Sequence, residues 1–301
     1  MQAADGMSIT PNTKNITNPS GQKKKAVVSI YKPKTPAAIS TALIGPILRS
    51  NEERHRHTDT QTPIKMSDNE RQEEAAPDSK ISADDGRRYW SSIDADVNGM
   101  LGGFPAVSRI DLRGSRSFLA KLGLGRTKGV KAVKRALEGG AGIGRITQGL
   151  LLDVAEAVDV VEPIAKFTAA LEGRPGVGRI YNLGLEEWRP EEDAVYDLVW
   201  NQWCLGHLTD QQLHAYLKRC GAALSRDEDG KVRGVIVVKE NLSTTGEDMF
   251  DDVDSSITRR DGSFRRIFEE AGLRIVKTEL QHGFPHELYP VRMYALKPRD
   301  V

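Results

Sequence analysis

Three glycines in a five-residue turn are the first feature of this sequence that suggests chemistry. Gly140, Gly142 and Gly144 stand between a predicted strand and an apolar stretch, and a turn without side chains lets the backbone approach a ligand closely. The dinucleotide-binding fingerprint fails, because its last glycine would fall on Arg145. Glu162 ends the next predicted strand, where a carboxylate can bind both hydroxyls of a ribose. An adenosine-type ligand without phosphate fits this pattern, and S-adenosyl-methionine (AdoMet) is our candidate.

Polar and aromatic residues follow the next predicted strands. Trp203 can be a core residue, or a flat wall for a proline ring or a cation. His207 can cap the helix that begins at Thr209, or act as a base near a methyl acceptor. Glu186 can bind an adenine amino group, or belong to a solvated helix start. Sequence spacing leaves both interpretations of each residue open.

An acidic loop follows the fifth predicted strand, with four Asp residues between Asp248 and Asp254. It lacks the glycine and the distal glutamate of a calcium-binding loop, so we expect no metal there. A run of charges is usually solvated. Because this loop stands at the end of the sheet where ligands bind, we expect it to hold a cationic substrate.

Strands and helices alternate from about residue 81 onward, which predicts an α/β fold with parallel strand pairing. A capping box at Thr209–Gln212 predicts a helix start, and Gly272 predicts the end of the last helix. We expect strands around 136–138, 160–162, 179–181, 196–200, 234–238, 274–279 and 291–296, and helices around 115–122, 163–171, 209–224 and 263–271.

The net charge of +1 for 301 residues hides two unlike parts. Residues 1–65 carry 10 Lys or Arg and 4 Asp or Glu, whereas the remaining residues carry 33 and 38. We therefore expect a disordered basic and polar arm over residues 1–80 and one globular domain over 81–301. The composition break at Met66 raises the hypothesis that translation starts there.

The composition also limits the cellular compartments in which we expect the protein. Cys204 and Cys220 lie in apolar segments, which favours buried free thiols in a reducing compartment. We find no apolar run long enough for a membrane span and no secretory signal. We expect a cytoplasmic protein, with the nucleus as a second location.

Taken together, these residues resemble the alpha-N-terminal protein methyltransferases. The similarity runs in order from about Tyr89 to the end of the chain, and residues 1–65 have no counterpart in it. The resemblance implies a class I, Rossmann-like sheet of seven strands, mostly parallel with an antiparallel C-terminal strand, plus an N-terminal helical lid. The segments that carry it are 89–90, 98–103, 140–147, 202–203, 206–211 and 251–256.

The resemblance also implies an activity and a set of site residues. Members methylate the α-amine of proteins whose exposed N-terminus reads Xaa-Pro-Lys, and ribosomal proteins are among the substrates we expect. AdoMet would be surrounded by Gly140, Arg145, Glu162, Leu185, Glu186 and Gln202. Trp203 would stack on the substrate proline, Asp251 and Ser256 would hold its lysine, and Leu101 and Tyr289 would line the channel. Asn241 would orient the α-amine, with Asp254 and His207 as general base.

Three departures from the family pattern stand at the cofactor side. Glu138-Gly139 replaces the familiar Asp-Cys, Glu162 replaces Asp, and Glu186 stands where Gln is common. The alternatives are a small-molecule methyltransferase, which the acidic loop disfavours, and a non-catalytic AdoMet-binding subunit, which the retention of Asp254 and His207 disfavours. We expect protein substrates as partners, no stable nucleic-acid or membrane partner, and a monomer.

Overall fold

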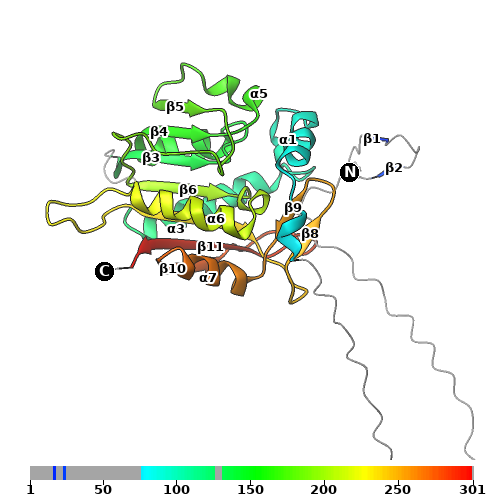
Figure 1. Cartoon of the computed structure of the whole chain (residues 1–301). Helices are drawn as coiled ribbons and strands as arrows, with labels where there is room; N and C mark the ends of the chain where they lie inside the picture. Colours follow the sequence, from blue (N-terminus) through cyan, green and yellow to red (C-terminus); the bar gives the residue numbers. More distant parts are fainter. Residues whose placement is uncertain (1–15, 18–22, 25–75, 126–130, 300–301) are drawn as a thin grey trace, which may run out of the picture. The chain divides into compact units, whose positions relative to one another are not determined.

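A single seven-stranded sheet forms the centre of the domain. The computed structural model describes residues 16–17, 23–24, 76–125 and 131–299. The strand order is β10-β11-β7-β6-β3-β4-β5 (Figure 1). Its strands are β3 (Val133–Gly139), β4 (Ala155–Val161), β5 (Val177–Tyr181), β6 (Leu198–Gln202), β7 (Val235–Asn241), β10 (Leu273–Leu280) and β11 (Val291–Pro298).

The pairing of these strands confirms the predicted fold class. Adjacent strands within the series β5, β4, β3, β6 and β7 pair in parallel. The last strand, β11, pairs antiparallel with both β7 and β10. The predicted strand at 196–200 is shifted by two residues, because Tyr196 forms only an isolated bridge to Leu224.

Helices cover both faces of the sheet, and the strand residues alternate between them. Leu137, Val199 and Ile236 belong to the core cluster that includes side chains of α6 (Asp210–Ala222) and α7 (Asp261–Glu270). Ala136, Trp200 and Val237 belong to the cluster that includes side chains of α3 (Val107–Lys121) and η2 (Thr147–Leu151). The central strands β6 and β7 are buried along their whole length, as expected for strands covered on both faces.

Two helix predictions differ from the structure. The helix expected at 115–122 is the second half of α3, which begins at Val107 directly after the turn at Pro105. The helix expected at 163–171 is instead a short α5 followed by a 3₁₀ turn. The remaining elements of the domain are α4 (Leu152–Val154), α5 (Ala165–Thr168), η3 (Ala169–Leu171), η4 (Leu205–His207), β8 (Met249–Asp251) and β9 (Ser256–Thr258).

Between residues 76 and 106, three elements precede α3: η1 (Pro77–Lys80), α1 (Ala83–Ser92) and α2 (Val97–Met100). Asp78 accepts a hydrogen bond from the backbone N–H of Asp210 (2.9 Å), at the start of α6. The Ser82 side chain caps α1, and its backbone N–H donates to the Ser255 hydroxyl (2.8 Å). These contacts fasten the N-terminal segment beside the carboxyl ends of the strands, where the lid is expected.

Little of the arm predicted for residues 1–80 falls within the described residues. Within it, β1 (Ile16–Thr17) and β2 (Lys23–Lys24) pair antiparallel, and residues 77–80 form η1. η1 thus lies just before the boundary predicted at residue 81. The rest of the arm, with Met66, lies outside the described residues. Across the described ranges, no helix is long and apolar enough to cross a membrane.

The predicted capping box is confirmed. The Thr209 hydroxyl accepts from the backbone N–H of Gln212 (3.2 Å), and the Gln212 side-chain oxygen accepts from the backbone N–H of Thr209 (2.9 Å). The predicted end of the last helix is confirmed as well, since Gly272 follows α7 with a φ of +74°. The start of α6 thereby fixes the end of the loop that follows β6.

We expect Thr209→Ala to lower the free energy of unfolding by about 1 kcal/mol, because the backbone N–H of Gln212 loses its acceptor. Urea denaturation followed by circular dichroism measures this change. Thr209→Ser is the matched control, since its hydroxyl keeps the bond and its stability should stay close to that of the wild type. Equal stability of the Ala variant and the wild type would contradict a contribution of the cap.

Candidate functional site

Two adjoining cavities lie at the carboxyl ends of the parallel strands, where an α/β sheet binds its ligands. The empty space between the lining residues, with the open solvent at the mouth included, is about 1060 Å³ for the first and about 550 Å³ for the second. Trp90, Met100, Trp203 and His207 line both cavities and therefore form the boundary between them. Two ligands, one bound in each cavity, would meet at this boundary.

The predicted glycine turn lies on the wall of the first cavity. Gly140, Gly142 and Gly144 have φ values of +66°, +54° and +71°, which favour glycine over every other residue. A Cβ atom at Gly142 would lie 2.9 Å from the sulfur of Met100, and one at Gly140 would collide with Cys204. The turn therefore needs glycine both for its backbone conformation and for its close packing.

Glu162 holds this turn to the end of β4. One carboxylate oxygen accepts from the backbone N–H of Gly142 and the other from that of Ile164, both at 2.9 Å. Burial raises the pKa of Glu162, and these two bonds lower it in part. Each oxygen keeps a further lone pair, so the carboxylate can still accept from a ligand hydroxyl.

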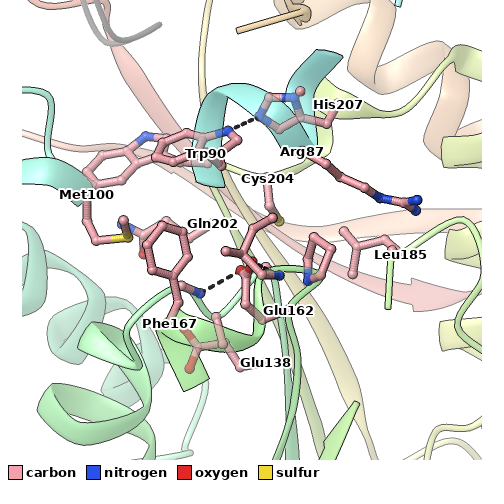
Figure 2. A pocket seen from close by; sticks show the side chains of 18 of the residues that line it. Arg87, Trp90, Met100, Glu138, Glu162, Phe167, Leu185, Gln202, Cys204 and His207 are labelled. Atoms are coloured by element: carbon pink, nitrogen blue, oxygen red, sulfur yellow. Dashed lines mark hydrogen bonds between the residues drawn. The ribbon is translucent and has the colours of Figure 1, made fainter. Parts of the chain in front are cut away.

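The residues of the first cavity fit AdoMet. Ile164, Phe167 and Leu185 offer apolar surface for an adenine ring, and Glu162 offers a carboxylate for a ribose. Arg145 offers a cation for the carboxylate of the methionine end. Figure 2 shows several of these side chains around one space. The structure brings together in this lining all six residues predicted for the cofactor: Gly140, Arg145, Glu162, Leu185, Glu186 and Gln202.

Glu138 is a cavity residue whose role the sequence did not indicate beyond its departure from the family pattern. It lies at the end of β3 and lines the first cavity, yet it is almost fully buried. The Thr147 hydroxyl donates to it. Burial raises the pKa of Glu138 to about 8, so a large share of this carboxyl is protonated at neutral pH.

Asp111 of α3 is a second residue that sequence reasoning missed. Its fully buried carboxylate accepts from Arg145 Nη1 (2.7 Å), from Gln202 Nε2 (2.9 and 3.0 Å) and from Lys239 Nζ (2.5 Å). Arg145 and Gln202 both line the first cavity. Because this aspartate lies in a stretch of α3 without a recognisable motif, only the fold reveals its position behind the cavity wall.

The second cavity contains part of the predicted substrate machinery. Asn241, Asp254 and Ser256 line it. Asp254 is 1% exposed and accepts from the Ser256 hydroxyl (2.6 Å). Burial raises the pKa of Asp254 to about 6. Ser255, between them, has a φ of +55°, a conformation that non-glycine residues adopt only at some energetic cost.

Three of the residues predicted to bind the substrate do not line the second cavity. Leu101 lines the first cavity instead of the second. Asp251 and Tyr289 are not among the residues that line either cavity, although burial and the charge of Asp251 both raise the pKa of Tyr289. Asp251 itself is partly buried on β8, and the backbone N–H of Val253 donates to it (2.9 Å). Within the described residues, no group of three His, Cys, Asp or Glu side chains could hold a metal ion.

Trp203 has an unusual backbone at the boundary between the cavities. Its φ of +54° lies in the left-handed region, which is rare for a bulky side chain and is often found at functional sites. The ring lies 5.5 Å from the guanidinium carbon of Arg145 and 6.3 Å from the ring of Phe284. These contacts hold the indole in place as a wall that both cavities share.

The contacts of His207 bear on its predicted role as a base. The Trp90 indole N–H donates to His207 Nε2 (2.9 Å), as Figure 2 shows. An indole nitrogen can only donate, so this bond requires an unprotonated Nε2. Burial lowers the pKa of His207 to about 4. In this arrangement Nε2 already accepts from Trp90, so the bond also connects the histidine to α1.

Helix α1 is also fastened at the rim of the first cavity. Arg87 Nη2 donates to Glu186 (2.7 Å) and Glu187 (2.8 Å), and Lys166 Nζ donates to the backbone carbonyl of Ile93 (2.7 Å). Glu186, predicted to bind adenine, thus also holds the lid. Helix α1 borders both cavities, because its residue Trp90 lines each of them.

Comparison with known proteins gives a consistent picture. Residues 78–297 match the family described as AdoMet-dependent proline di-methyltransferase. The alpha N-terminal protein methyltransferase 1 of Schizosaccharomyces pombe is 44% identical over 218 residues, covering 70% of this chain and 94% of that protein. The N-terminal Xaa-Pro-Lys N-methyltransferase 1 of Rattus norvegicus is 39% identical, with coverages of 74% and 99%. A solved SAM-dependent methyltransferase from Leishmania major is 36% identical, with a TM-score of 0.61 and coverages of 70% and 81%.

We expect His207 to remain neutral down to about pH 4, because its burial and the Trp90 bond both favour the neutral ring. Trp90→Phe removes the bond to the neutral form, so the pKa of His207 should rise. Long-range ¹H–¹⁵N spectra of histidine-labelled protein measure both values. A wild-type midpoint at or above the ordinary histidine value of about 6.5 would show that the ring is free to take a proton.

Proposed function

The chain belongs to the AdoMet-dependent proline di-methyltransferase family, and on that premise we propose that it methylates the α-amine of proteins whose exposed N-terminus reads Xaa-Pro-Lys. The observation that carries this proposal is the pair of adjoining cavities, which share Trp90, Met100, Trp203 and His207. The first fits AdoMet, and the second is lined by a residue with a buried carboxylate, Asp254, and by one with an amide, Asn241. AdoMet, when bound, supplies an electrophilic methyl group for attack by a nitrogen.

The α-amine must lose a proton before it can attack. Its ordinary pKa is about 8, so most of it is protonated at neutral pH. Asp254 supports the role of general base, because its carboxylate lines the second cavity and its pKa of about 6 leaves it mostly ionised at neutral pH. Asn241, on the same wall, can hold the amine in line.

His207 has a different role in this proposal. Its Nε2 already accepts from Trp90, so it holds the lid helix over the boundary between the cavities. A lid that excludes water strengthens the interactions of Asp254 with the amine. His207 is therefore a positioning residue, and Asp254 receives the proton.

The negative charge of the acidic segment supports selection of a lysine as the third residue of the substrate. The loop from Asp248 to Asp254 carries four carboxylates, and Asp251 lies within it, partly buried. A lysine is favoured there, whereas an acidic residue would meet like charges. Trp203 supplies a flat wall for the proline ring between the α-amine and this lysine.

We further propose that the protein acts as a monomer in the cytoplasm and nucleus, without a stable nucleic-acid or membrane partner. Cys204 and Cys220 support a reducing compartment, because both are buried free thiols. Ribosomal proteins with a suitable N-terminus belong to the proposed substrates.

The substrate class is tested with three peptides that begin Ala-Pro-Lys, acetyl-Ala-Pro-Lys and Ala-Pro-Glu. We expect the purified protein and AdoMet to add methyl groups to the first, as measured by mass spectrometry. Acetylation should abolish the reaction, because an amide nitrogen is not nucleophilic. The glutamate should raise KM by about tenfold or more through like-charge repulsion. Equal methylation of the acetylated peptide would place the modification on the lysine side chain and contradict the proposal.

The base is tested with Asp254→Asn, which keeps an oxygen for the Ser256 hydroxyl. We expect kcat/KM at neutral pH to fall by about a hundredfold. Wild-type kcat/KM should decrease below a pH of about 6, where Asp254 becomes protonated. In the variant only the free amine reacts, so kcat/KM should keep rising up to a pH of about 8.

Binding of S-adenosyl-homocysteine is the control for this variant, because Asp254 does not line the first cavity. Its affinity should stay within about twofold of the wild type. A variant that keeps the wild-type turnover and pH profile would remove Asp254 from the mechanism.

A further inference from the structure

A cluster of charged side chains lies behind the wall of the first cavity, and only some of its members line that cavity. Lys239 of β7 and Asp111 of α3 are fully buried, and neither lines a cavity. Arg145 connects them to the cavity, because its Nη1 donates to Asp111 and its side chain lies in the lining. Gln202 makes the same connection through its amide.

The surroundings of Lys239 are those of a charged ammonium. Its Nζ lies 2.5 Å from Asp111 Oδ1, 2.9 Å from the Ser115 hydroxyl and 2.9 Å from the Gln281 side-chain oxygen. An ammonium group has three N–H donors, and each finds an acceptor here. Burial lowers the pKa of Lys239 and Asp111 counteracts this in part, whereas the three acceptors around Nζ favour the charged form.

The cluster contains one more positive than negative charge. Asp111 is one anion between two cations, Lys239 and Arg145, and none of the three is more than slightly exposed. A buried charge without a counterion is costly. The pair of Asp111 and Lys239 is neutral, so the excess positive charge resides on Arg145, the member that faces the cavity.

We propose that Lys239 is a positioning residue for the methyl donor: it neutralises Asp111, so that Arg145, which Asp111 holds in place, keeps its charge for the carboxylate of AdoMet. This inference rests on the proposed function, since it assumes that AdoMet occupies the first cavity. Lys239 does not line the cavity, and its ion pair with Asp111 is the contact that connects it to the ligand side of Arg145. It therefore governs affinity for the amino-acid end of the ligand and leaves the adenosine end alone.

The rival interpretation is that Lys239 only fastens α3 to the sheet. Lys121 offers the matched control, because it also joins α3 to the sheet through an ion pair with Glu279 of β10 (2.7 Å). That pair is partly exposed, and neither Lys121 nor Glu279 lines the cavities. Lys121→Met thus makes the same substitution without changing the charge near Arg145.

The test compares two ligands by isothermal titration calorimetry. S-adenosyl-homocysteine carries the carboxylate, and 5′-methylthioadenosine has the same adenosine and thioether but lacks the amino-acid end. With Lys239→Met, Arg145 is the remaining cation in contact with Asp111, so affinity for S-adenosyl-homocysteine should fall by about tenfold or more. Affinity for 5′-methylthioadenosine should change by less than about twofold, and Lys121→Met should change neither.

The double variant Lys239→Met with Asp111→Asn gives the decisive rescue. Asparagine keeps an acceptor for Arg145 but removes the uncompensated anion, so affinity for S-adenosyl-homocysteine should return to within about threefold of the wild type. A structural staple would show no rescue, because the double variant has even fewer bonds between α3 and the sheet.

Three outcomes would overturn the inference: equal losses for both ligands, no loss for either, or no recovery in the double variant. If the single variant fails to fold, as judged by circular dichroism, the double variant decides the question, since the inference expects it to fold and bind. Failure of the wild-type protein to bind S-adenosyl-homocysteine would instead contradict the proposed function itself.

Discussion

The site depends on carboxylates that are buried at the carboxyl ends of the strands. Charges removed from water must find hydrogen bonds within the protein, and two of these carboxylates find them on backbone N–H groups. Glu162 binds those of Gly142 and Ile164, and Glu240 binds those of Cys204 and Leu205. These bonds fix the glycine turn after β3 and the loop after β6. The shape of both cavities follows from this requirement.

The same burial gives the carboxylates different chemistry. Burial raises the pKa of Glu138 to about 8 and that of Asp254 to about 6, whereas the cations around Asp111 outweigh its burial and lower its pKa. Asp254 is thus ionised at neutral pH yet able to take a proton, and Asp111 remains an anion. Helices α1 and α3 make this difference possible, because one borders the cavities through Trp90 and the other carries Asp111.

The sequence was sufficient for the parts of the site that depend on local backbone geometry. The glycine turn, Glu162 after the second strand and the capping box at Thr209 follow from spacing alone, because each needs particular residue types at fixed intervals. The fold class followed from the alternation of strands and helices. The resemblance to a known family then assigned Asp254 and Asn241, which the acidic loop alone could not place.

Other features depend on contacts between distant segments and could not be predicted. Asp111 and Lys239 meet across more than a hundred residues of sequence, and neither stands in a recognisable motif. The bond between Trp90 and His207 joins α1 to the loop after β6, and it changes how the histidine can act.

The proposed mechanism requires that the α-amine of the substrate contacts Asp254. A crystal structure with S-adenosyl-homocysteine and an Ala-Pro-Lys peptide tests this most directly. We predict that the α-amine lies about 3 Å from Asp254 and that the Trp90–His207 bond is intact. An amine bound to His207 Nε2, with that bond broken and Asp254 out of reach, would contradict it.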